Sequence, residues 1–369
     1  MKIVEVIFSL TPGGAEHLVV DLSNELSKTD EVVVLTLKDD RVDSDNRTFY
    51  KSELSDRVTY KNLGFGSGLN LRKMWQIYKA IRAEKADIVH LNLRNIPKYC
   101  LLAIILLHKK VKFVQTIHND MASYNELFYR IYFETLGRLK WVHFVTISET
   151  NFKDMQRMHP CVDACYILNG RAPVTPSPLY EEVKKEIAAY RATPDTKIFL
   201  HVARCSAQKN QDLLIDAFNE LEKRGADVKL LMIGAGFDSE RGQRLLAKAG
   251  PNTVYLGTRK NVGDYMLNSD LFTLSSQYEG MPITLIEASL AGIPAVCTPV
   301  CGAVDMLVNG KNGYLSNNFE TDDFVNALAE GARNCSELRA NAQEMKKVSP
   351  FAIGICAAKY KKFFSGESA

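Results

Sequence analysis

The stretch Ser-Ser-Gln-Tyr-Glu279-Gly-Met-Pro282-Ile-Thr-Leu-Ile-Glu287-Ala joins a strand-like segment to a helix-like one. Pro282 suits the first helical turn, where its missing N–H costs nothing, and Gly292 suits the end of the helix after Ala291. Glu279 then lies in the loop before the helix, and Glu287 lies more than one turn inside it. We expect both carboxylates to face one ligand near the positive helix end, where an anion or a polyhydroxyl molecule would bind.

A pair of glutamates at this spacing is, on its own, more often a capping residue and a solvated helix face. The neighbouring segments favour a ligand site instead. Asp270-Leu-Phe-Thr-Leu-Ser-Ser before the loop is typical of a buried strand, and Ile293-Pro-Ala-Val-Cys-Thr after the helix is typical of another. Two strands joined by a helix form a βαβ unit, and such units bind ligands at the carboxyl ends of their strands.

The whole chain continues this alternation of strands and helices, without an internal repeat. Its 369 residues are more than one hydrophobic core usually serves, so we expect two domains. The only Pro-rich stretch, Asn169-Gly-Arg-Ala-Pro-Val-Thr-Pro-Ser-Pro, lies near the middle and is predicted to link them. The predicted strands are Ile3–Phe8, Val32–Leu37, Ile88–Leu91, Lys112–Ile117, His143–Ile147, Cys165–Leu168, Lys197–Ala203, Lys229–Ile233, Thr253–Leu256, Leu271–Leu274 and Ala295–Cys297. The predicted helices include Glu16–Ser27, Leu71–Glu84, Gln211–Arg224 and Thr321–Asn334.

The composition indicates a soluble globular protein with reduced thiols. Hydrophobic residues make up 46% of the chain and charged residues 24%. The longest apolar run, Tyr99 to Leu107, is too short to span a bilayer. None of the eight cysteines belongs to a Cys-x-x-Cys pair, which favours a cytoplasmic location. His159, Cys161 and Cys165 lie close in sequence, but no fourth ligand follows at a zinc-like spacing.

Charge is distributed unevenly along the chain, whose formal net charge is +3. Residues 1–56 hold 6 Lys/Arg and 12 Asp/Glu, a net charge of −6, whereas residues 57–157 hold 17 and 7, a net charge of +10. This basic stretch, mixed with apolar residues and Trp75, suits an anionic membrane surface or a phosphorylated lipid head group. Ordinary solvated helix faces explain it equally well. No motif for binding nucleic acid accompanies the charge, so we expect no nucleic-acid partner. The basic residues include Lys73, Lys79, Lys109, Lys110 and Lys112.

Two further loops suit anions. Thr-Pro-Gly13-Gly14-Ala-Glu16 follows the first strand and precedes a helix, so its backbone N–H groups can approach a phosphate closely, although Gly-Gly at such a turn is common. In the second half, Arg204 and Lys209 follow the strand that ends near residue 203 and precede the next helix. Two cations at a strand's carboxyl end suit a diphosphate.

Taken together and in order, these segments resemble a family-four retaining glycosyltransferase of the GT-B type. The resemblance covers about residues 3 to 320, and the ordered set is more specific than any one motif. It implies an α/β fold of two Rossmann-like parallel-sheet domains that face each other across a cleft. It also implies a first domain over residues 1–170, a second over residues 171–350 that binds the nucleotide-sugar, and a C-terminal segment, residues 351–369, that packs back on the first. The motifs are Gly13-Gly14-Ala15-Glu16, His118, Ile147-Ser148-Glu149, Asn169-Gly170, Arg204 with Lys209, Gly234-Ala-Gly236, Glu279-x7-Glu287 and Asn312-Gly313.

The resemblance also implies roles for single residues. Arg204 and Lys209 would neutralise the donor diphosphate, whose charge grows as the bond to the sugar breaks. Glu287 would accept hydrogen bonds from the ribose hydroxyls, Glu279 would hold the sugar, and His118 would contact the sugar near the reaction centre. An isolated histidine is more often a packing or surface residue, and only its place after a strand favours this role. The remaining donor-binding positions are Gly13, Gly14, Gly234, Gly280, Met281, Pro282, Ile283 and Thr284.

Several positions depart from the family pattern. His90-Leu-Asn92 replaces a frequent His-x-His, and Ala203 stands where a glycine usually precedes the arginine. Asn169-Gly-Arg171 lacks the usual acidic residue, and Cys301-Gly302 replaces Gly-Gly. The first departure concerns the acceptor side and the others concern loop shape and donor choice. None removes a charged residue that the mechanism needs.

The implied activity is transfer of a hexose or N-acetylhexosamine from a nucleoside-diphosphate sugar, with UDP preferred over GDP, to a saccharide or lipid-linked saccharide, with the lipid-linked form preferred, in the synthesis of a surface polysaccharide or another glycan. It needs neither a metal nor another cofactor, and it places the protein in the cytoplasm, either free or peripheral on the inner face of the membrane. One alternative enzyme is a nucleotide-sugar epimerase of the same architecture, and a non-catalytic nucleotide-sugar-binding regulator is the alternative outside enzymes. A metal-dependent transferase could use Asp43 and Asp45, although these lie in an acidic, surface-like run.

Overall fold

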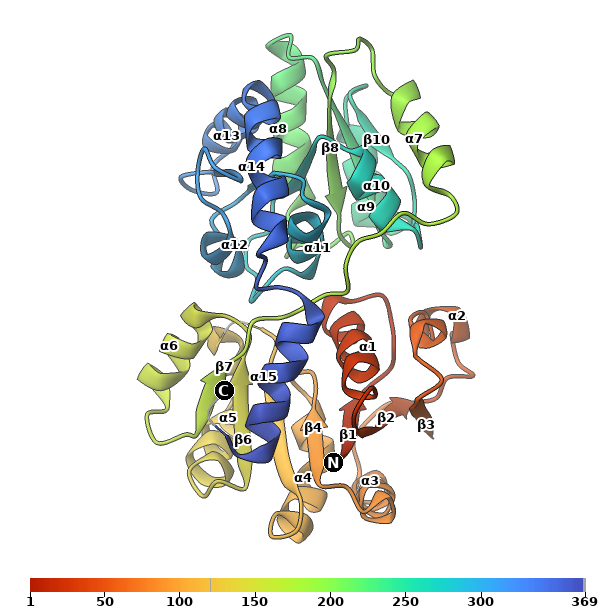
Figure 1. Ribbon diagram of the computed structural model, residues 1–369, viewed down its shortest axis with the longest axis vertical. Coiled ribbons are helices and arrows are strands. Elements are labelled where there is room, and N and C mark those ends of the chain that lie inside the picture. Colours follow the sequence, from red (N-terminus) through yellow and green to blue (C-terminus); the bar gives the residue numbers. More distant parts are fainter. Residues whose placement is uncertain (120, 368–369) are drawn as a thin grey trace. The chain divides into compact units, whose positions relative to one another are not determined.

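In a computed structural model, which describes residues 1–119 and 121–367, the chain divides into two compact units. Unit 1 comprises Met1–Ala172 and Pro350–Ala369, and unit 2 comprises Pro173–Ser349. Each unit is a parallel sheet flanked by helices (Figure 1). The first division therefore falls inside the Pro-rich stretch, and the end of the chain belongs to unit 1.

The sheet of unit 1 has the strand order β3-β2-β1-β4-β5-β6-β7, with every neighbouring pair parallel. Numbering reverses between β1 and β4, so the carboxyl ends of these two strands mark the switch point where open α/β sheets bind ligands. The strands are β1 (Lys2–Ile7), β2 (Glu31–Lys38), β3 (Val58–Phe65), β4 (Ile88–Leu91), β5 (Lys112–Ile117), β6 (Val142–Thr146) and β7 (Ala164–Tyr166).

Helices of unit 1 connect these strands, and the last one comes from the end of the chain. Helix α15 carries Tyr360, which is fully buried and bonds Thr116 of β5 through its hydroxyl at 2.8 Å. The approach is close, because a Cβ on Gly170 would lie 2.6 Å from the Cβ of Cys356. The helices are α1 (Gly14–Leu26), α2 (Ser44–Arg47), η1 (Lys51–Glu53), α3 (Leu71–Glu84), α4 (Ile96–Leu107), η2 (Met121–Tyr124), α5 (Leu127–Tyr132), η3 (Phe133–Gly137), α6 (Glu149–Met158) and α15 (Ile353–Ser365).

The sheet of unit 2 has the strand order β10-β9-β8-β11-β12-β13, again with parallel neighbours. Its switch point lies between β8 and β11. The strands are β8 (Lys197–Val202), β9 (Val228–Ile233), β10 (Thr253–Tyr255), β11 (Leu271–Leu274), β12 (Ala295–Cys297) and β13 (Gly313–Leu315). The helices are α7 (Tyr180–Ala189), α8 (Gln211–Lys223), α9 (Glu240–Lys248), α10 (Val262–Asn268), α11 (Ile283–Ala291), α12 (Cys301–Met306), α13 (Thr321–Arg333) and α14 (Cys335–Lys347).

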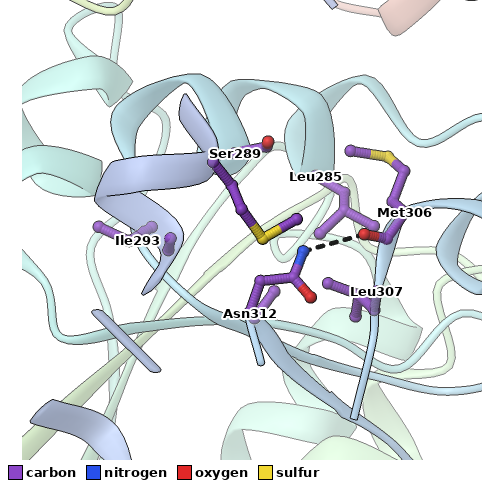
Figure 2. Close-up of a pocket in the computed structure, with 9 residues that line it drawn as sticks. Leu285, Ser289, Ile293, Met306, Leu307 and Asn312 are labelled. Carbon is purple, nitrogen blue, oxygen red and sulfur yellow. Dashed lines mark hydrogen bonds between the residues drawn. The ribbon is translucent and has the colours of Figure 1, made fainter. Parts of the chain in front are cut away.

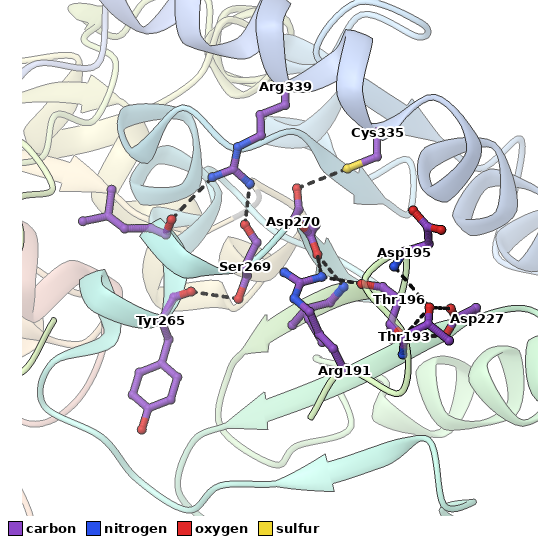
Figure 3. A network of polar contacts seen from close by, with 12 residues as sticks. Arg191, Thr193, Asp195, Thr196, Asp227, Tyr265, Ser269, Asp270, Cys335 and Arg339 are labelled. Carbon is purple, nitrogen blue, oxygen red and sulfur yellow. Dashed lines mark hydrogen bonds and ion pairs between the residues drawn. The ribbon is translucent and has the colours of Figure 1, made fainter. Parts of the chain in front are cut away.

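A polar network fixes the amino end of β11 (Figure 3). The carboxylate of Asp270 accepts a hydrogen bond from Arg191 Nη1 at 2.6 Å and from the backbone N–H of Ile198 at 2.8 Å. Arg339 of α14 donates to the carbonyl of Ser269 at 2.7 Å. Because a strand is stiff over four residues, anchoring its start also sets the position of the loop that leaves its other end.

The α/β class predicted from the sequence is confirmed, and all eleven predicted strands exist with ends shifted by at most two residues. Two strands, β3 and β13, were not predicted. β3 is an edge strand with few buried residues, and its polar residues and Gly64 hide the apolar pattern that is typical of a strand. β13 has only three residues, too few to show a pattern. Among the described residues, no helix is long and apolar enough to cross a membrane.

Candidate active site

Loops from β8 and β11 carry the charged residues that the sequence singled out in unit 2. Arg204 and Lys209 lie between β8 and α8, and Glu279 lies between β11 and α11. These are the carboxyl ends of the two strands at the switch point, so the loops are neighbours. Backbone and side-chain hydrogen bonds join them, from Gln277 N–H to the carbonyl of Gln208 at 2.8 Å and from Gln208 Nε2 to the carbonyl of Tyr278 at 3.0 Å.

Glu279 and Lys209 form an ion pair between these loops. The side chains are only 9% and 18% exposed, respectively. Glu279 Oε1 accepts a second hydrogen bond, from Ser276 Oγ at 2.7 Å, and Ser275 Oγ donates to the backbone carbonyl of Lys209 at 2.9 Å. The sequence analysis predicted that Lys209 binds a diphosphate and that Glu279 binds a sugar, but it did not predict that the two residues contact each other. The repeated serines just before the loop were the available signal.

Arg204 differs from Lys209 because its side chain is exposed. Among the described residues, no carboxylate pairs with its guanidinium, so it is the cation of this edge that can receive an anion without first losing a partner. Its backbone carbonyl accepts from Gln211 Nε2 at 2.8 Å, which fixes the loop to the start of α8.

Gly234 belongs to the third loop at this edge, after β9. A Cβ on it would lie 1.9 Å from the carbonyl oxygen of Ala203, and its φ of 153° is one that other residues rarely adopt. Packing against the neighbouring backbone therefore accounts for this glycine, whether or not it also contacts a ligand. It keeps the β8 and β9 loops together beside Arg204.

Helix α11 starts one residue later than the sequence suggested. Pro282 is the N-cap residue and not part of the first turn, and Gly292 ends the helix in the left-handed conformation with a φ of 74°. The reason is that Pro282 has a ψ of 112°, which is extended and not helical. No side chain of the described residues caps this helix, so the first backbone N–H groups, those of Ile283 and Thr284, suit an incoming acceptor.

Glu287 lies at the fifth position of α11, so the prediction that it sits more than one turn inside the helix is confirmed. It is partly exposed, as is Thr284 three residues earlier, whereas most other residues of the helix are buried. Residues three apart lie on one helix face, so the polar face of α11 starts at its N-terminus and includes this carboxylate.

The opposite face of α11 borders a small cavity. Figure 2 shows Leu285, Ser289, Met306 and Asn312 around it, and its volume is about 20 Å³. One water needs roughly 10–15 Å³ on this measure, so the cavity holds a single water at most and is a packing defect. The side of α11 that carries Thr284 and Glu287 is therefore the side on which the structure leaves room for a ligand.

Gly302 of α12 holds the loop before α11 in place. A Cβ on it would lie 2.7 Å from the Cα of Met281, 2.7 Å from Cδ of Pro282 and 2.9 Å from the carbonyl oxygen of Gly280. Any larger residue would push this backbone away. The sequence identified Cys301-Gly302 as a departure from Gly-Gly, and the structure shows that the second position is the one that needs glycine.

The Gly13-Gly14 turn of unit 1 leads from β1 into α1, as predicted, although the helix begins at Gly14 and not at Glu16. A carboxylate of the chain lies beside this turn. The side chain of Glu16 folds back, so that its Oε2 would be 2.3 Å from a Cβ on Gly13, and Thr11 Oγ1 donates to Glu16 Oε1 at 3.3 Å. An anion approaching Gly13 would meet this negative charge first. Gly14 is exposed and remains the more accessible of the two glycines.

His118 lies after β5, at the same edge of the unit 1 sheet as the Gly13-Gly14 turn. Its Nε2 is 3.2 Å from Asn92 Oδ1, and Asn92 Nδ2 donates to Glu5 Oε2 at 2.8 Å. Burial, together with the nearby His90, lowers the pKa of His118 to about 3, so the imidazole is neutral at pH 7.

The contact with Glu5 decides which nitrogen of His118 carries the proton. Asn92 Nδ2 donates to Glu5 Oε2, so the amide turns its oxygen, which only accepts, toward His118. His118 Nε2 is then the donor, and Nδ1 keeps its lone pair as an acceptor. The sequence missed Glu5, although a charge inside the apolar strand Lys2–Ile7 was a visible signal.

The network continues from Glu5 away from His118. His90 Nδ1 lies 3.0 Å from Glu5 Oε1, His90 Nε2 lies 2.7 Å from Thr116 Oγ1, and Thr116 bonds Tyr360 of α15. Glu5, His90 and Thr116 are all buried and come from three strands. The position of His118 therefore depends on groups from β1, β4, β5 and α15.

A metal site is not evident in the part of the chain that the structure describes. No three His, Cys, Asp or Glu side chains of residues 1–119 and 121–367 lie close enough to hold an ion together. Asp43 accepts a hydrogen bond from Asn46 Nδ2 at 2.9 Å.

Two family models match the chain one after the other. Glycosyltransferase Family 4 matches residues 12–170, and Glycosyl transferases group 1 matches residues 182–347. The chain is a family 4, group 1 glycosyltransferase. Both matches include the loops described above, on unit 1 and on unit 2.

Similar proteins agree with this assignment. An uncharacterized glycosyltransferase of Methanocaldococcus jannaschii is 26% identical over 246 residues, which are 62% of this chain and 59% of that protein, less than two thirds of its length. The N-acetyl-alpha-D-glucosaminyl L-malate synthase of Bacillus anthracis is 25% identical over 283 residues, 73% of this chain and 71% of that one. The crystal structure of Anabaena HepE with UDP and glucose has a TM-score of 0.78 and 17% identity, over 99% of this chain and 100% of that one, and shows the GT-B fold.

Proposed function

We propose that this glycosyltransferase moves a hexose or N-acetylhexosamine from a nucleoside-diphosphate sugar to a saccharide acceptor, with retention of configuration and without a metal. The observation that carries the proposal is the group of Arg204, Lys209 and Glu279 beside the uncapped start of α11. UDP is the preferred nucleotide, and the UDP and glucose held by Anabaena HepE support this choice.

The two cations and the helix start would act on the donor diphosphate. Negative charge builds up on the leaving phosphate as the bond to the sugar breaks, so fixed positive groups stabilise the transition state more than the ground state. Arg204 can bind the diphosphate directly, whereas Lys209 must first break its ion pair with Glu279 or bind both groups together. A diphosphate that draws Lys209 away would free the Glu279 carboxylate to accept hydrogen bonds from sugar hydroxyls. Glu287, further along α11, would accept from the ribose hydroxyls.

His118 is proposed to contact the transferred sugar. Because its Nε2 proton is directed at Asn92, its Nδ1 would accept a hydrogen bond from a sugar hydroxyl. With a pKa near 3 it does not act as a general base at pH 7. The acceptor's proton would instead pass to the leaving phosphate oxygen on the same face of the sugar, which is consistent with retention.

We further propose a lipid-linked acceptor of a surface polysaccharide, with the protein at the cytoplasmic side of a membrane. All eight cysteines are free thiols, which supports a reducing compartment. The last turn of helix α4 exposes Ile105 and Leu106, and exposed Lys109 and Lys110 follow the helix, a combination that suits an anionic leaflet. Sedimentation with phosphatidylserine vesicles and phosphatidylcholine vesicles tests this, and equal binding to both at low salt would contradict it.

A screen of nucleotide-sugars tests the main proposal. We expect one UDP-sugar to raise the melting temperature and to release UDP faster when a saccharide acceptor is added, with activity that survives EDTA. Loss of activity in EDTA with recovery in Mn²⁺ would instead favour a metal-dependent transferase. Product formed without any acceptor would indicate an epimerase, and tight donor binding without turnover would indicate a regulator.

The variant Glu287→Ala tests the ribose contact. A charged acceptor of a hydrogen bond contributes about 1.5–3 kcal/mol, so we expect UDP affinity to fall by roughly 10-fold to 150-fold. Glu240→Ala, at an exposed carboxylate of α9, is the matched control and should leave affinity unchanged. Unchanged UDP affinity in Glu287→Ala would exclude this residue from the ribose site.

A further inference from the structure

A basic pocket lies at the edge of the unit 1 sheet opposite to the one that carries His118. Residues 108–112, which lead into β5, and residues 140, 141 and 143, at the start of β6, line it. Its volume is about 200 Å³, enough for a polyatomic ion and its waters, since one water needs roughly 10–15 Å³ on this measure. Parallel strands point their carboxyl ends one way, so this pocket is separate from the candidate active site.

Positive charge in the pocket is not balanced by the chain. Lys109, Lys110 and Lys140 are exposed, and no carboxylate of the described residues pairs with any of them. Among the residues that the structure describes, no Asp or Glu lines the pocket, and Asp163 is the acidic residue whose carboxylate bonds a lining side chain, accepting from His143 Nδ1 at 2.8 Å. Three like charges around one hollow repel each other, and an anion between them would remove that repulsion.

The fourth lysine of the pocket, Lys112, already has a hydrogen-bond partner. Lys112 donates to the backbone carbonyl of Phe363 and lies 4.7 Å from the centre of its ring. Burial lowers the pKa of Lys112, although the nearby Asp163 acts in the opposite direction. Lys112 therefore holds α15 in place. The lining lysines that can still bind an anion are Lys109, Lys110 and Lys140.

The aromatic side of the pocket is rigid. His108 stacks on Trp141 with ring centres 3.8 Å apart and an angle of 14° between the planes. Its Nδ1 donates to the carbonyl of Ile105 at 3.0 Å, because a carbonyl oxygen only accepts. This contact fixes the imidazole beside the lysines. Lys140 has a φ of 57°, a conformation that is uncommon outside glycine, at the turn that leads into Trp141.

We propose that this pocket binds a phosphate group through Lys109, Lys110 and Lys140. A phosphate dianion offers several oxygens at once, and ammonium groups that have no partner meet it as point charges. Two sources share this chemistry, a small soluble phosphate and the headgroup of a phosphomonoester lipid. The inference is independent of the proposed transferase activity, since none of its residues belongs to the candidate active site, but it shares Lys109 and Lys110 with the proposed contact with a membrane.

Trp141 provides a local signal for the test. The chain has two tryptophans, so Trp75→Phe leaves Trp141, which lines the pocket, as the only one. The full chain carrying Trp75→Phe is titrated with inorganic phosphate, with sodium chloride at matched ionic strength as the reference. We expect a saturable change in Trp141 emission with phosphate alone.

Two variants in the same background complete the design. Lys109→Gln, Lys110→Gln and Lys140→Gln together should weaken phosphate binding at least 10-fold. Lys184→Gln, Lys185→Gln and Lys311→Gln, which remove the same charge from exposed sites of unit 2, should not change it. Equal responses to phosphate and chloride, or equal binding by the two triple variants, would overturn the proposal and leave only general charge screening.

Binding to vesicles distinguishes the two sources of phosphate, a soluble phosphate and a lipid headgroup. Phosphatidylcholine vesicles with phosphatidic acid are compared with vesicles of phosphatidylcholine alone, with and without inorganic phosphate. Binding to the phosphatidic acid vesicles that phosphate competes away, and that the pocket variant loses, assigns a lipid headgroup. A saturable Trp141 response to phosphate with no vesicle preference assigns a soluble phosphate. Vesicle binding that the pocket variant retains would contradict the pocket as the lipid site.

Discussion

At the scale of single residues, the candidate active site holds a charged pair whose two members have different proposed tasks. Glu279 and Lys209 neutralise each other in a site that is mostly shielded from water. Removing one partner of such a pair leaves a buried charge, so loss of activity in a single variant does not by itself reveal a catalytic role. A useful experiment separates stability from turnover.

Lys209→Ala is expected to lower the free energy of unfolding by about 3 kcal/mol, because Glu279 keeps its burial and loses its cation. Turnover should fall more than donor affinity, since the lost charge acts mainly during bond cleavage. In the double variant Lys209→Ala/Glu279→Gln the stability should largely return while turnover stays low. Urea unfolding and steady-state kinetics measure both quantities, and an equal loss of kcat and donor affinity would indicate uniform binding.

Glu5→Gln is expected to move the proton of His118 from Nε2 to Nδ1. A glutamine that places its NH₂ at Asn92 and its oxygen at His90 Nδ1 requires the Asn92 amide to reverse and to donate to His118 Nε2, and this is the orientation we predict. The ¹⁵N chemical shifts of the imidazole ring report the tautomer, and His118→Asn identifies its signals among the seven histidines. We expect kcat to fall with UDP affinity unchanged.

Glu25→Gln, at a carboxylate that pairs with Lys28 outside the network, is the control and should leave the spectrum of His118 unaltered. An unchanged tautomer in Glu5→Gln would contradict the predicted reversal of Asn92 and would mean that the amide at position 5 keeps its oxygen toward Asn92.

His201 predicts a pH dependence of stability. It is buried, its Nδ1 donates to the carbonyl of Thr273 at 3.0 Å, and burial lowers its pKa to about 4. The unfolded chain binds this proton below about pH 6.5 and the folded chain only below about pH 4, so stability is lost as the pH falls between these values, by about 3 kcal/mol in total. His201→Asn should remove that part of the loss in urea unfolding from pH 8 to 4. A difference between variant and wild type that stays constant with pH would contradict this origin.

At the scale of elements, the sequence predicted the βαβ order and most strands because buried parallel strands are continuous apolar runs. It could not predict β3, whose edge position leaves it polar, or the N-cap position of Pro282, which depends on a single ψ angle. The ion pair between Lys209 and Glu279 joins residues 70 positions apart, and no local pattern encodes such a contact.

Gly302→Ala tests how strongly α12 positions the start of α11. The new Cβ would meet the backbone of Met281 at 2.7 Å and must displace it, at a cost of about 1–3 kcal/mol. We expect reduced donor affinity together with reduced stability of unit 2. The control Gly354→Ala lies inside α15, where the nearest atom is 3.7 Å from the new Cβ, and should be neutral or stabilising. Unchanged donor affinity in Gly302→Ala would show that the loop before α11 adjusts freely.

At the scale of the whole molecule, both units follow one plan. Each has a parallel sheet whose strand order reverses once, and the residues singled out from the sequence follow the carboxyl ends of the strands at that reversal or one strand away from it, as His118 does after β5 and Gly234 after β9. Loops with little sequence in common are therefore brought to equivalent places in the two units. The chain order is broken only at its end, because α15 follows the last helix of unit 2 and belongs to unit 1.

Tyr360→Ala is expected to destabilise unit 1 and to spare unit 2. Tyr360 is fully buried and bonds Thr116, and removing a large aromatic side chain from a core costs about 3–5 kcal/mol. Both tryptophans lie in unit 1, so their fluorescence during thermal unfolding reports that unit alone, whereas stabilisation by UDP is expected to report unit 2. Phe324→Ala, in the core of unit 2, should give the converse result. If Tyr360→Ala lowered the UDP-dependent transition as much as the tryptophan transition, the two units would unfold as one cooperative body, and a side chain of α15 would stabilise the donor site as well as its own sheet.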